Sequence, residues 1–192
     1  MSAYVKYIEA SGARVVPLIV SDSDDVLQMK LDHVDGVLFP GGAGDYIDMG
    51  MKVLDYAKKM NDQGHFFPLW GTCLGFERLV AFTADSPGDA LSLIEAEHVS
   101  LPITFTKDPT TTRMYQGLGQ SAWELQNNPF LYNGHHFGVK PETMENDAGL
   151  KSFWDVTAIS YTPDDEKTAF VASVEAKNYP FFGTQYHPEK PS

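Results

Sequence analysis

The sequence predicts an α/β fold in which a mostly parallel central sheet is covered by helices on both faces. Up to residue 73, short apolar runs typical of buried strands alternate with stretches of helical periodicity, and this alternation favours a parallel sheet. Hydrophobic residues make up 43% of the 192 residues and aromatic residues 12%, a composition typical of a folded globular chain. The alternation of strand-like and helix-like stretches ends after residue 86, and beyond it we expect an added antiparallel β-segment.

The first half of the chain supplies the alternating elements. Apolar positions at helical spacing end at Gly12, and the acidic residues within 22–25 complement the dipole of the next helix. The expected elements are a helix over 4–11, a strand over 14–20, a helix from Ser21 or Ser23 to about residue 33, a strand over 35–39 and a helix from about 48 to 62.

The second half predicts strands joined by irregular segments. Turn residues at 163–166 separate two β-rich stretches, which predicts an antiparallel hairpin. The chain shows no repeat and no interdomain linker, so we expect one domain over residues 1–192. The expected elements are a strand over 98–106, short helical pieces within 109–128, the hairpin of 153–161 and 168–175, and a last strand over 181–186.

Cys73 is the only cysteine, and it lies in a G-x-C-x-G pattern between an apolar run and a helix-compatible run. This pattern predicts a strand, a tight turn and a helix. The helix N-terminus at such a turn favours a thiolate, and backbone N–H groups face any oxyanion that the thiolate creates. Gly71 and Gly75 suit a sharp turn and a close approach of helix and strand. The alternative is a small buried hydrophobic residue, which is common for a free cysteine.

A thiol nucleophile needs a base, and the base needs a group that orients it. His187 is the best of six histidines because Glu189 lies two residues further on. In an extended segment these two side chains point to the same side, so the glutamate can accept a hydrogen bond from the imidazole. Pro188 keeps His187 out of a helical conformation. By itself, H-x-E is more typical of an exposed polar strand end, and it is the cysteine pattern elsewhere in the chain that favours a catalytic base.

Pro40-Gly41-Gly42 ends a predicted strand at what would be the same carboxyl edge of the sheet. The two glycines can free a backbone N–H to point into the site. Together with the N–H of Leu74, directly after the cysteine, this gives two donors for a tetrahedral oxyanion. An ordinary glycine-rich turn is the alternative.

The remaining signals exclude several classes of function. A formal net charge of −12 argues against nucleic acid or an anionic membrane as a partner, because both repel an acidic surface. No apolar run approaches the length of a membrane span, and residues 1–6 do not form a signal peptide. His135 and His136 lie between turn signals, where we expect a loop. We discount a metal site there because no carboxylate or cysteine lies at ligand spacing.

Together these segments resemble γ-glutamyl hydrolase, a family of the class I glutamine amidotransferase-like superfamily. The resemblance runs along nearly the whole chain and is carried by residues 2–7 with 11–17, 38–42, 70–77 and 185–190. G-x-C-x-G with H-P-E is shared across the superfamily, whereas W-G-T-C-L-G-F-E is more particular to the hydrolase. The implied fold is a flavodoxin-like three-layer sandwich.

The resemblance implies a role for each matching residue. Cys73 is the nucleophile, His187 is the general base and Glu189 is its partner. Gly42 and Leu74 supply the oxyanion hole.

The substrate-binding residues that the resemblance implies are His135, Gly41 and Glu77. His135 falls where the family has a second active-site histidine. Because Gly134 interrupts the family's motif here, the choice between His135 and His136 stays open. Glu77 is either a structural residue or a substrate contact.

The implied reaction is hydrolysis of γ-glutamyl amide bonds in folate and antifolate poly-γ-glutamates through a thioester, without a metal or organic cofactor. The partner is a small molecule, with no nucleic acid and no membrane, and a homodimer stays open. The implied location is the lysosome or outside the cell. An anionic tail needs local positive charge, for which Arg78 and Arg113 are candidates, although each is more typical of a surface residue.

The chain departs from the family at both ends. The family has a β-strand before the helix that matches 4–11, and it continues beyond the segment matching H-P-E-K. We therefore expect that the N-terminal strand is missing and that the chain is truncated at both ends. A first strand usually lies inside such a sheet, and its loss leaves backbone groups unpaired. Expressed as written, the chain is expected to show poor solubility or little activity.

Two other functions remain as alternatives. A glutaminase domain that passes ammonia to a synthetase would use the same three residues. A catalytically inactive relative would act as a binding protein. The intact Cys73, His187 and Glu189 argue against inactivity, and the missing strand argues for it.

Overall fold

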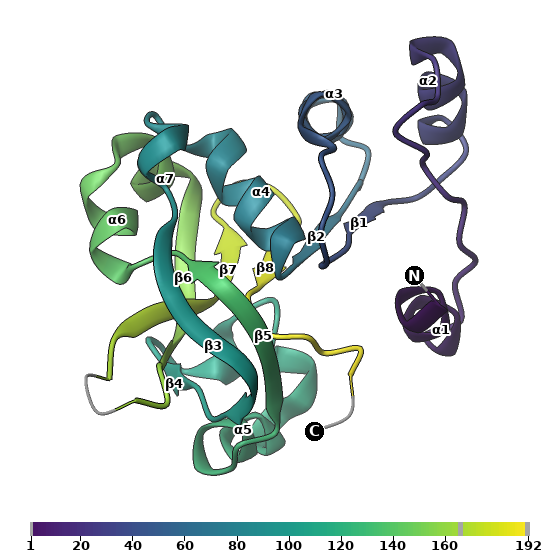
Figure 1. The fold of residues 1–192 in the computed structure, drawn as a ribbon. Helices are drawn as coiled ribbons and strands as arrows, with labels where there is room; N and C mark the ends of the chain where they lie inside the picture. The colour runs from purple at the N-terminus through teal and green to yellow at the C-terminus, as the bar shows by residue number, and fades with distance from the viewer. Residues whose placement is uncertain (1, 165–166, 191–192) are drawn as a thin grey trace.

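The protein has an α/β fold built on a mixed sheet, in a computed structural model that describes residues 2–164 and 167–190. Six strands lie in the order β1-β2-β8-β7-β6-β4 (Figure 1). The strands are β1 (Val37–Phe39), β2 (Leu69–Thr72), β8 (Phe181–Thr184), β7 (Ala169–Ala176), β6 (Trp154–Tyr161) and β4 (Thr104–Phe105). The α/β class predicted from the sequence is confirmed.

The neighbouring strands β1, β2 and β8 are parallel and form one half of the sheet. Phe39 pairs with Gly71 across β1 and β2, and Thr72 pairs with Thr184 across β2 and β8. The three strands therefore end at one edge of the sheet. In open α/β sheets this carboxyl edge is where ligands bind, because the segments that follow the strands meet there.

The other half of the sheet is antiparallel. β7 pairs with β8 and β6, and β6 pairs with β4. The β6–β7 pair is the predicted hairpin, although residues 165 and 166 of its turn lie outside the described residues. A separate ribbon of two antiparallel strands joins β3 (Ser92–Leu101) to β5 (Leu131–Gly138). The β6–β7 hairpin confirms the predicted antiparallel addition, whereas the β3–β5 ribbon was not predicted.

Longer helices and short turns alternate with these strands. Ser23 is the residue that caps the second helix, because its Oγ accepts a hydrogen bond from Val26 N at 3.4 Å. The α-helices are α1 (Ser2–Ala10), α2 (Asp24–Leu31), α3 (Ile47–Asp62), α4 (Leu74–Thr83), α5 (Glu124–Asn127), α6 (Pro141–Asn146) and α7 (Ala148–Phe153). The 3₁₀ turns are η1 (Pro87–Asp89), η2 (Pro109–Thr111) and η3 (Gln116–Trp123).

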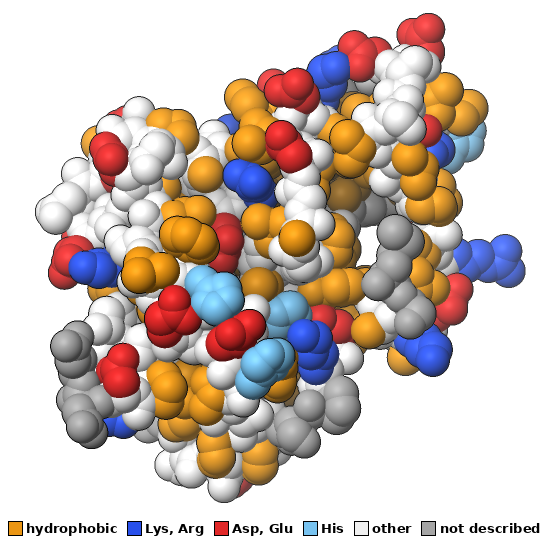
Figure 2. Space-filling view, viewed as in Figure 1, with side chains coloured by type: hydrophobic (Ala, Val, Ile, Leu, Met, Phe, Trp, Pro, Cys, Tyr) orange, Lys and Arg blue, Asp and Glu red, His pale blue; other side chains and the backbone are white. Residues whose placement is uncertain are grey.

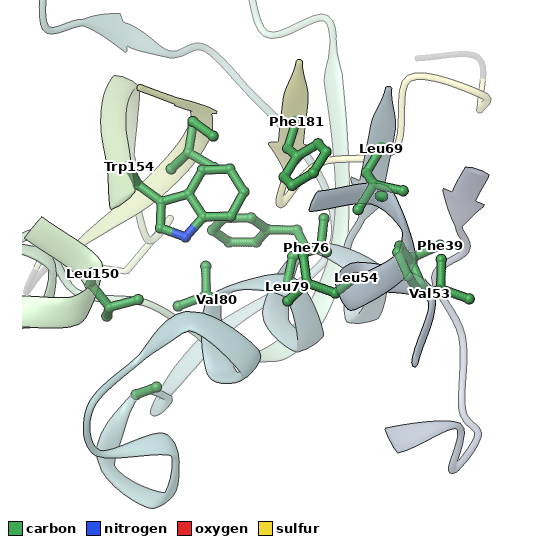
Figure 3. Close-up of a cluster of buried hydrophobic side chains, with 14 of the residues drawn as sticks. Phe39, Val53, Leu54, Leu69, Phe76, Leu79, Val80, Leu150, Trp154 and Phe181 are labelled. Carbon is green, nitrogen blue, oxygen red and sulfur yellow. The ribbon is translucent and has the colours of Figure 1, made fainter. Parts of the chain in front are cut away.

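Both faces of the sheet are covered, as neighbouring residues of β7 show. Val171 belongs to the main hydrophobic core, which contains Phe76 and Leu79 of α4 (Figure 3). Ala172 points to the opposite face and belongs to a second cluster with Tyr115 and other residues near the 3₁₀ turns. The three-layer arrangement is therefore present, but the second face is covered by short turns and the β3–β5 ribbon where the sequence predicted helices.

The segment 14–20 is not a strand, contrary to the prediction. A strand needs a neighbour that takes its N–H and C=O groups. Within residues 2–164 and 167–190, no strand pairs with this segment, and none pairs with the outer edge of β1. Val16 and Val20 are consequently 46% and 60% exposed. β-Rich composition alone was a misleading signal here.

No described helix combines the length and the apolar character that crossing a bilayer requires.

Candidate active site

Three segments that are far apart in the sequence meet at the carboxyl edge of the parallel strands. Residues 40–42 follow β1, Cys73 follows β2, and residues 185–189 follow β8. A Cβ built on Gly41 lies 2.9 Å from Cε1 of His187 and 3.0 Å from Cβ of Cys73. The nucleophile and base predicted from the sequence therefore lie on either side of Gly41.

Cys73 occupies a strained turn between β2 and α4. Its φ of 52° and ψ of −113° place it at the N-cap of α4 in the left-handed region, which L-residues rarely adopt. Neither Gly71 nor Gly75 carries the unusual φ that the sequence suggested for them. They serve close approach instead, since a Cβ on Gly75 would lie 2.0 Å from the carbonyl oxygen of Phe39. The turn therefore holds the sulfur against a rigid backbone.

The thiol of Cys73 is protonated in the resting site. Burial raises its pKa to about 12, the Glu77 carboxyl adds to this, and the N–H of Leu74 and the charge of Lys190 oppose it. The helix N-terminus acts in the direction that the sequence predicted, but burial outweighs it. A thiol held in this way needs a base to take its proton before it can act as a nucleophile.

His187 has the orienting partner that its spacing predicted. Its Nδ1 lies 2.7 Å from Oε1 of Glu189, and both side chains are buried. Burial favours a protonated Glu189, but interactions led by the His187 hydrogen bond outweigh it and lower the pKa of this carboxyl. Glu189 is thus an ionised acceptor. Because Nδ1–H donates to Glu189, the other ring nitrogen is left as the base.

The backbone N–H groups of Gly42 and Leu74 follow β1 and β2 at this edge, and they remain the predicted donors to an oxyanion. Gly42 has a φ of +116°, which favours glycine and turns the backbone after β1. The N–H of Leu74 faces the Cys73 sulfur and begins α4, where no helical carbonyl can accept it. The N–H of Gly41 is already used, because it donates to Oη of Tyr4 at 2.8 Å. Gly41 therefore lines the site without a free donor.

His135 and His136 lie in β5, which corrects the loop predicted from the Asn-Gly turn signal. Pairing with β3 overrides that local signal. His135 is only 4% exposed, and burial lowers its pKa to about 4. In the described part of the chain, neither of its ring nitrogens has a hydrogen-bond partner.

His136 points the other way, into an exposed cluster. Its Nδ1 lies 2.7 Å from Glu95, and its Nε2 lies 3.4 Å from Glu97. Figure 2 shows histidine and acidic side chains together on this face. Of the two histidines, His135 is the one close enough to His187 for their charges to interact.

Glu77 is buried behind the nucleophile, one turn into α4. Its Oε1 accepts a hydrogen bond from Nε2 of Gln185 at 2.9 Å, and burial raises the pKa of its carboxyl. This contact joins α4 to the segment that carries His187. The described contacts of Glu77 are those of a structural residue.

The two arginines proposed as positive charges lie in different settings. Arg113 donates to the carbonyl oxygens of Tyr179 and Ala176 and stacks on the Phe182 ring, near the start of β8. It is therefore a structural anchor away from the strand ends. Arg78 is half-buried beside Glu77 and favours the ionised form of that carboxyl.

Sequence reasoning missed three residues around His187. Oη of Tyr4 lies 3.3 Å from Nδ1 of His187, and the Tyr132 carbonyl accepts from the His187 N–H at 2.9 Å. The ammonium of Lys190 lies 4.5 Å from the centre of the Tyr132 ring and favours the Cys73 thiolate. Only Lys190 had a sequence signal, namely its place directly after H-P-E.

No group of three or more His, Cys, Asp or Glu side chains that could hold a metal ion is found in residues 2–164 and 167–190.

Comparison with known proteins gives matches along almost the whole chain. The glutamine amidotransferase class-I family matches residues 2–192. Gamma-glutamyl hydrolase B of Dictyostelium discoideum is 36% identical over 99% of this chain and 56% of its own length. The gamma-glutamyl hydrolases of Rattus norvegicus and Homo sapiens are each 32% identical over 98% of this chain and 60% of their own length. The chain thus spans less than two thirds of these curated relatives.

A solved structure supports the fold. A protein from Thermoplasma acidophilum, described as a subunit of GMP synthase, superposes with a TM-score of 0.58 at 17% identity. The match covers 98% of this chain and 78% of that one.

Proposed function

The chain belongs to the class-I glutamine amidotransferase family, and we propose that it hydrolyses γ-glutamyl amide bonds of folate and antifolate poly-γ-glutamates. The observation that carries this proposal is the convergence of Cys73 with the His187–Glu189 pair at one sheet edge. The gamma-glutamyl hydrolase names of relatives at 32–36% identity support the choice of substrate.

Attack begins with proton transfer from Cys73. Because burial raises the thiol pKa, the sulfur loses its proton to His187 as it bonds to the γ-carbonyl carbon. Glu189 holds the imidazole by Nδ1 and stabilises the imidazolium that forms. A general base of this kind contributes about 10²–10⁴-fold to the rate.

The tetrahedral oxyanion is bound between the N–H groups of Gly42 and Leu74. Each such donor is worth about 10²–10³-fold in kcat. His187 then protonates the leaving amine as the C–N bond breaks, which leaves a thioester on Cys73. Water, deprotonated by His187, hydrolyses the thioester and restores the thiol.

Substrate binding needs positive charge, because a γ-glutamyl tail carries a free carboxylate on each residue. Lys190 supplies it next to Cys73, where its charge favours the thiolate. His135 stays neutral at physiological pH, so it offers a hydrogen-bonding ring without a charge. We assign both residues to the substrate side of the site, with Gly41 packed between Cys73 and His187.

The resemblance alone supports three further proposals: a lysosomal or secreted location, a homodimer, and independence from cofactors. Size-exclusion chromatography with light scattering tests the homodimer, and activity after dialysis against a chelator tests the metal independence.

The test compares two substrates. The purified protein is incubated with a γ-glutamyl oligomer attached to folate and, separately, with glutamine. Release of glutamate or shorter glutamyl chains from the oligomer, with no ammonia from glutamine, is expected. Cys73→Ala and His187→Gln are expected to lower the rate at least about 10³-fold, because triad members act as a unit.

Other outcomes favour the alternatives. Ammonia release from glutamine alone identifies a glutaminase domain. Turnover of neither substrate, in a protein whose Cys73 also resists iodoacetamide at pH 8, identifies an inactive binding relative.

A further inference from the structure

Tyr4 brings a hydroxyl group from α1 into the centre of the site. Its Oη accepts the N–H of Gly41 at 2.8 Å and lies 3.3 Å from Nδ1 of His187. It also helps to lower the pKa of the Glu189 carboxyl. One side chain from the start of the chain therefore touches both the turn after β1 and the segment after β8, and Figure 1 shows that segment extending toward α1.

The protons around this hydroxyl have one consistent arrangement. The Gly41 N–H donates to Oη, and Nδ1–H of His187 donates to Glu189 at 2.7 Å. Oη lies 3.3 Å from the same Nδ1, so it can accept this N–H as a second, longer branch. The imidazole is thus held by Glu189 and by the Tyr4 hydroxyl.

Close packing against Gly41 also restricts the position of the Tyr4 hydroxyl. A Cβ on Gly41 would lie 2.6 Å from Oη of Tyr4, in addition to its short distances to His187 and Cys73. Position 41 has to be glycine for these three groups to approach one another. The Tyr4 hydroxyl, the His187 imidazole and Cβ of Cys73 therefore all lie close to Gly41.

We propose that Tyr4 is a positioning residue, whose hydroxyl bridges the Gly41 N–H and the His187 imidazole and so keeps His187 aligned with Cys73. The kinetic consequences of this role rest on the proposed hydrolase function, whereas the hydrogen bonds of Tyr4 are independent of it. It assigns α1 to the catalytic machinery through a contact with the His187–Glu189 pair. Tyr4 does not exchange a proton with the substrate.

The His187–Glu189 pair titrates among several neighbours, which any pH profile has to consider. These neighbours come from α1, the turn that carries Cys73, α4, β5 and the segment after β8. The titratable and charged groups that face the pair are Tyr4, Tyr7, Cys73, Glu77, His135 and Lys190.

Tyr4→Phe removes only the hydroxyl, and Tyr7→Phe is its matched control. Tyr7 lies one turn later in α1, is half-buried like Tyr4 and also faces Glu189, but it has no hydrogen bond to the Gly41 turn. We expect Tyr4→Phe to lower kcat about 10- to 100-fold, the effect of losing one hydrogen bond to a charged group. KM should stay within about twofold, and Tyr7→Phe should change both constants less than about twofold.

The pH profile separates positioning from a merely structural effect. The Tyr4 hydroxyl helps to lower the pKa of Glu189. Without it, the Glu189 carboxylate holds the proton of the pair more strongly, so the acid limb of kcat/KM moves to higher pH. A structural role for Tyr4 would lower the melting temperature and leave the profile in place. An unchanged acid limb with unchanged kcat overturns the proposal.

A double-mutant cycle adds a second variant. Gly41→Ala pushes its methyl group against the Tyr4 hydroxyl. The factor by which Gly41→Ala lowers kcat should therefore be at least about fivefold smaller in the Tyr4→Phe background than in the wild type. Strictly multiplicative effects would contradict a direct contact between the two residues.

Alkylation of Cys73 by iodoacetamide distinguishes this proposal from the proposed function. It needs no substrate, and it depends on His187 taking the thiol proton. We expect Tyr4→Phe to slow alkylation at pH 7 at least about fivefold relative to Tyr7→Phe. If the wild type cleaves no γ-glutamyl bond but this difference appears, the function fails and the positioning role stands. Equal alkylation rates overturn the positioning role whatever the substrate is.

Discussion

The parallel strands and the segment 14–20 have similar β-rich, apolar sequences but opposite environments. Leu69 and Phe39 of the strands are 0% and 3% exposed, whereas Val16 and Val20 of the segment are 46% and 60% exposed. The strands have neighbours on which to pair, and the segment has none in the described part of the chain. Apolar composition therefore creates a strand only where another strand accepts its backbone groups.

The site residues also differ in whether they belong to the packed sheet. Cys73, Gly42 and His187 follow strands whose packing fixes them, while Tyr4 comes from a helix outside the sheet and is fixed by hydrogen bonds to the site. Stability should therefore depend on the strand-end region, and α1 should affect catalysis more than stability.

Phe76→Ala should give the largest loss of stability. Phe76 is fully buried between α4 and β8, where its ring approaches Gly183. Truncation of such a ring leaves a cavity and costs about 3–5 kcal/mol. Phe66→Ala is the control, since Phe66 is 77% exposed, and it should cost less than about 0.5 kcal/mol in urea unfolding. Equal losses in the two variants would contradict the described core.

Gly75→Ala should come next and should also remove activity. The added Cβ would meet the Phe39 carbonyl oxygen at 2.0 Å, so α4 has to move away from β1. Overpacking of this kind costs about 3 kcal/mol, and the shift displaces Cys73 from its base. Gly88→Ala, where a Cβ meets nothing within 4 Å, should be neutral in both measurements. A fully active and stable Gly75→Ala protein would rule out this close approach.

The sequence predicted the parts of the molecule whose signals are local. Neighbouring residues predict the strand–turn–helix around Cys73, the Ser23 cap and the β6–β7 hairpin. The segment 14–20 and the strand around His135 did not, because pairing partners decide both. Tyr4 was missed for the same reason, since its contacts lie 37 and 183 residues away.

His135 should make stability depend on pH. Its pKa of about 4 in the folded protein lies below the ordinary value of 6.5, so the unfolded chain binds more protons between these values. Stability is then lost as the pH falls from 6.5 towards 4, by about 3 kcal/mol at most, since one pKa unit corresponds to about 1.4 kcal/mol. Urea unfolding at pH 7 and pH 4.5 should show a smaller difference for His135→Phe than for the wild type.

His136, on the same strand, should affect the pH dependence of stability in the opposite direction. Glu95 raises its pKa, so its contribution is present at low pH and is lost as the pH rises through the folded value. His136→Gln should therefore leave the acid destabilisation intact or increase it slightly. A His135→Phe protein with the wild-type pH dependence would show that His135 is not buried in its neutral form.

Val20→Thr should give the smallest effect and tests the exposed side of the comparison. The substitution keeps the shape of the side chain and adds a hydroxyl that water can reach, so the free energy of unfolding should change by less than about 0.5 kcal/mol. Val171→Thr places the same hydroxyl in β7, where the side chain is 0% exposed, and should cost about 1–3 kcal/mol. If Val20→Thr cost as much as Val171→Thr, segment 14–20 would be buried in solution, and the contrast between the two regions would fail.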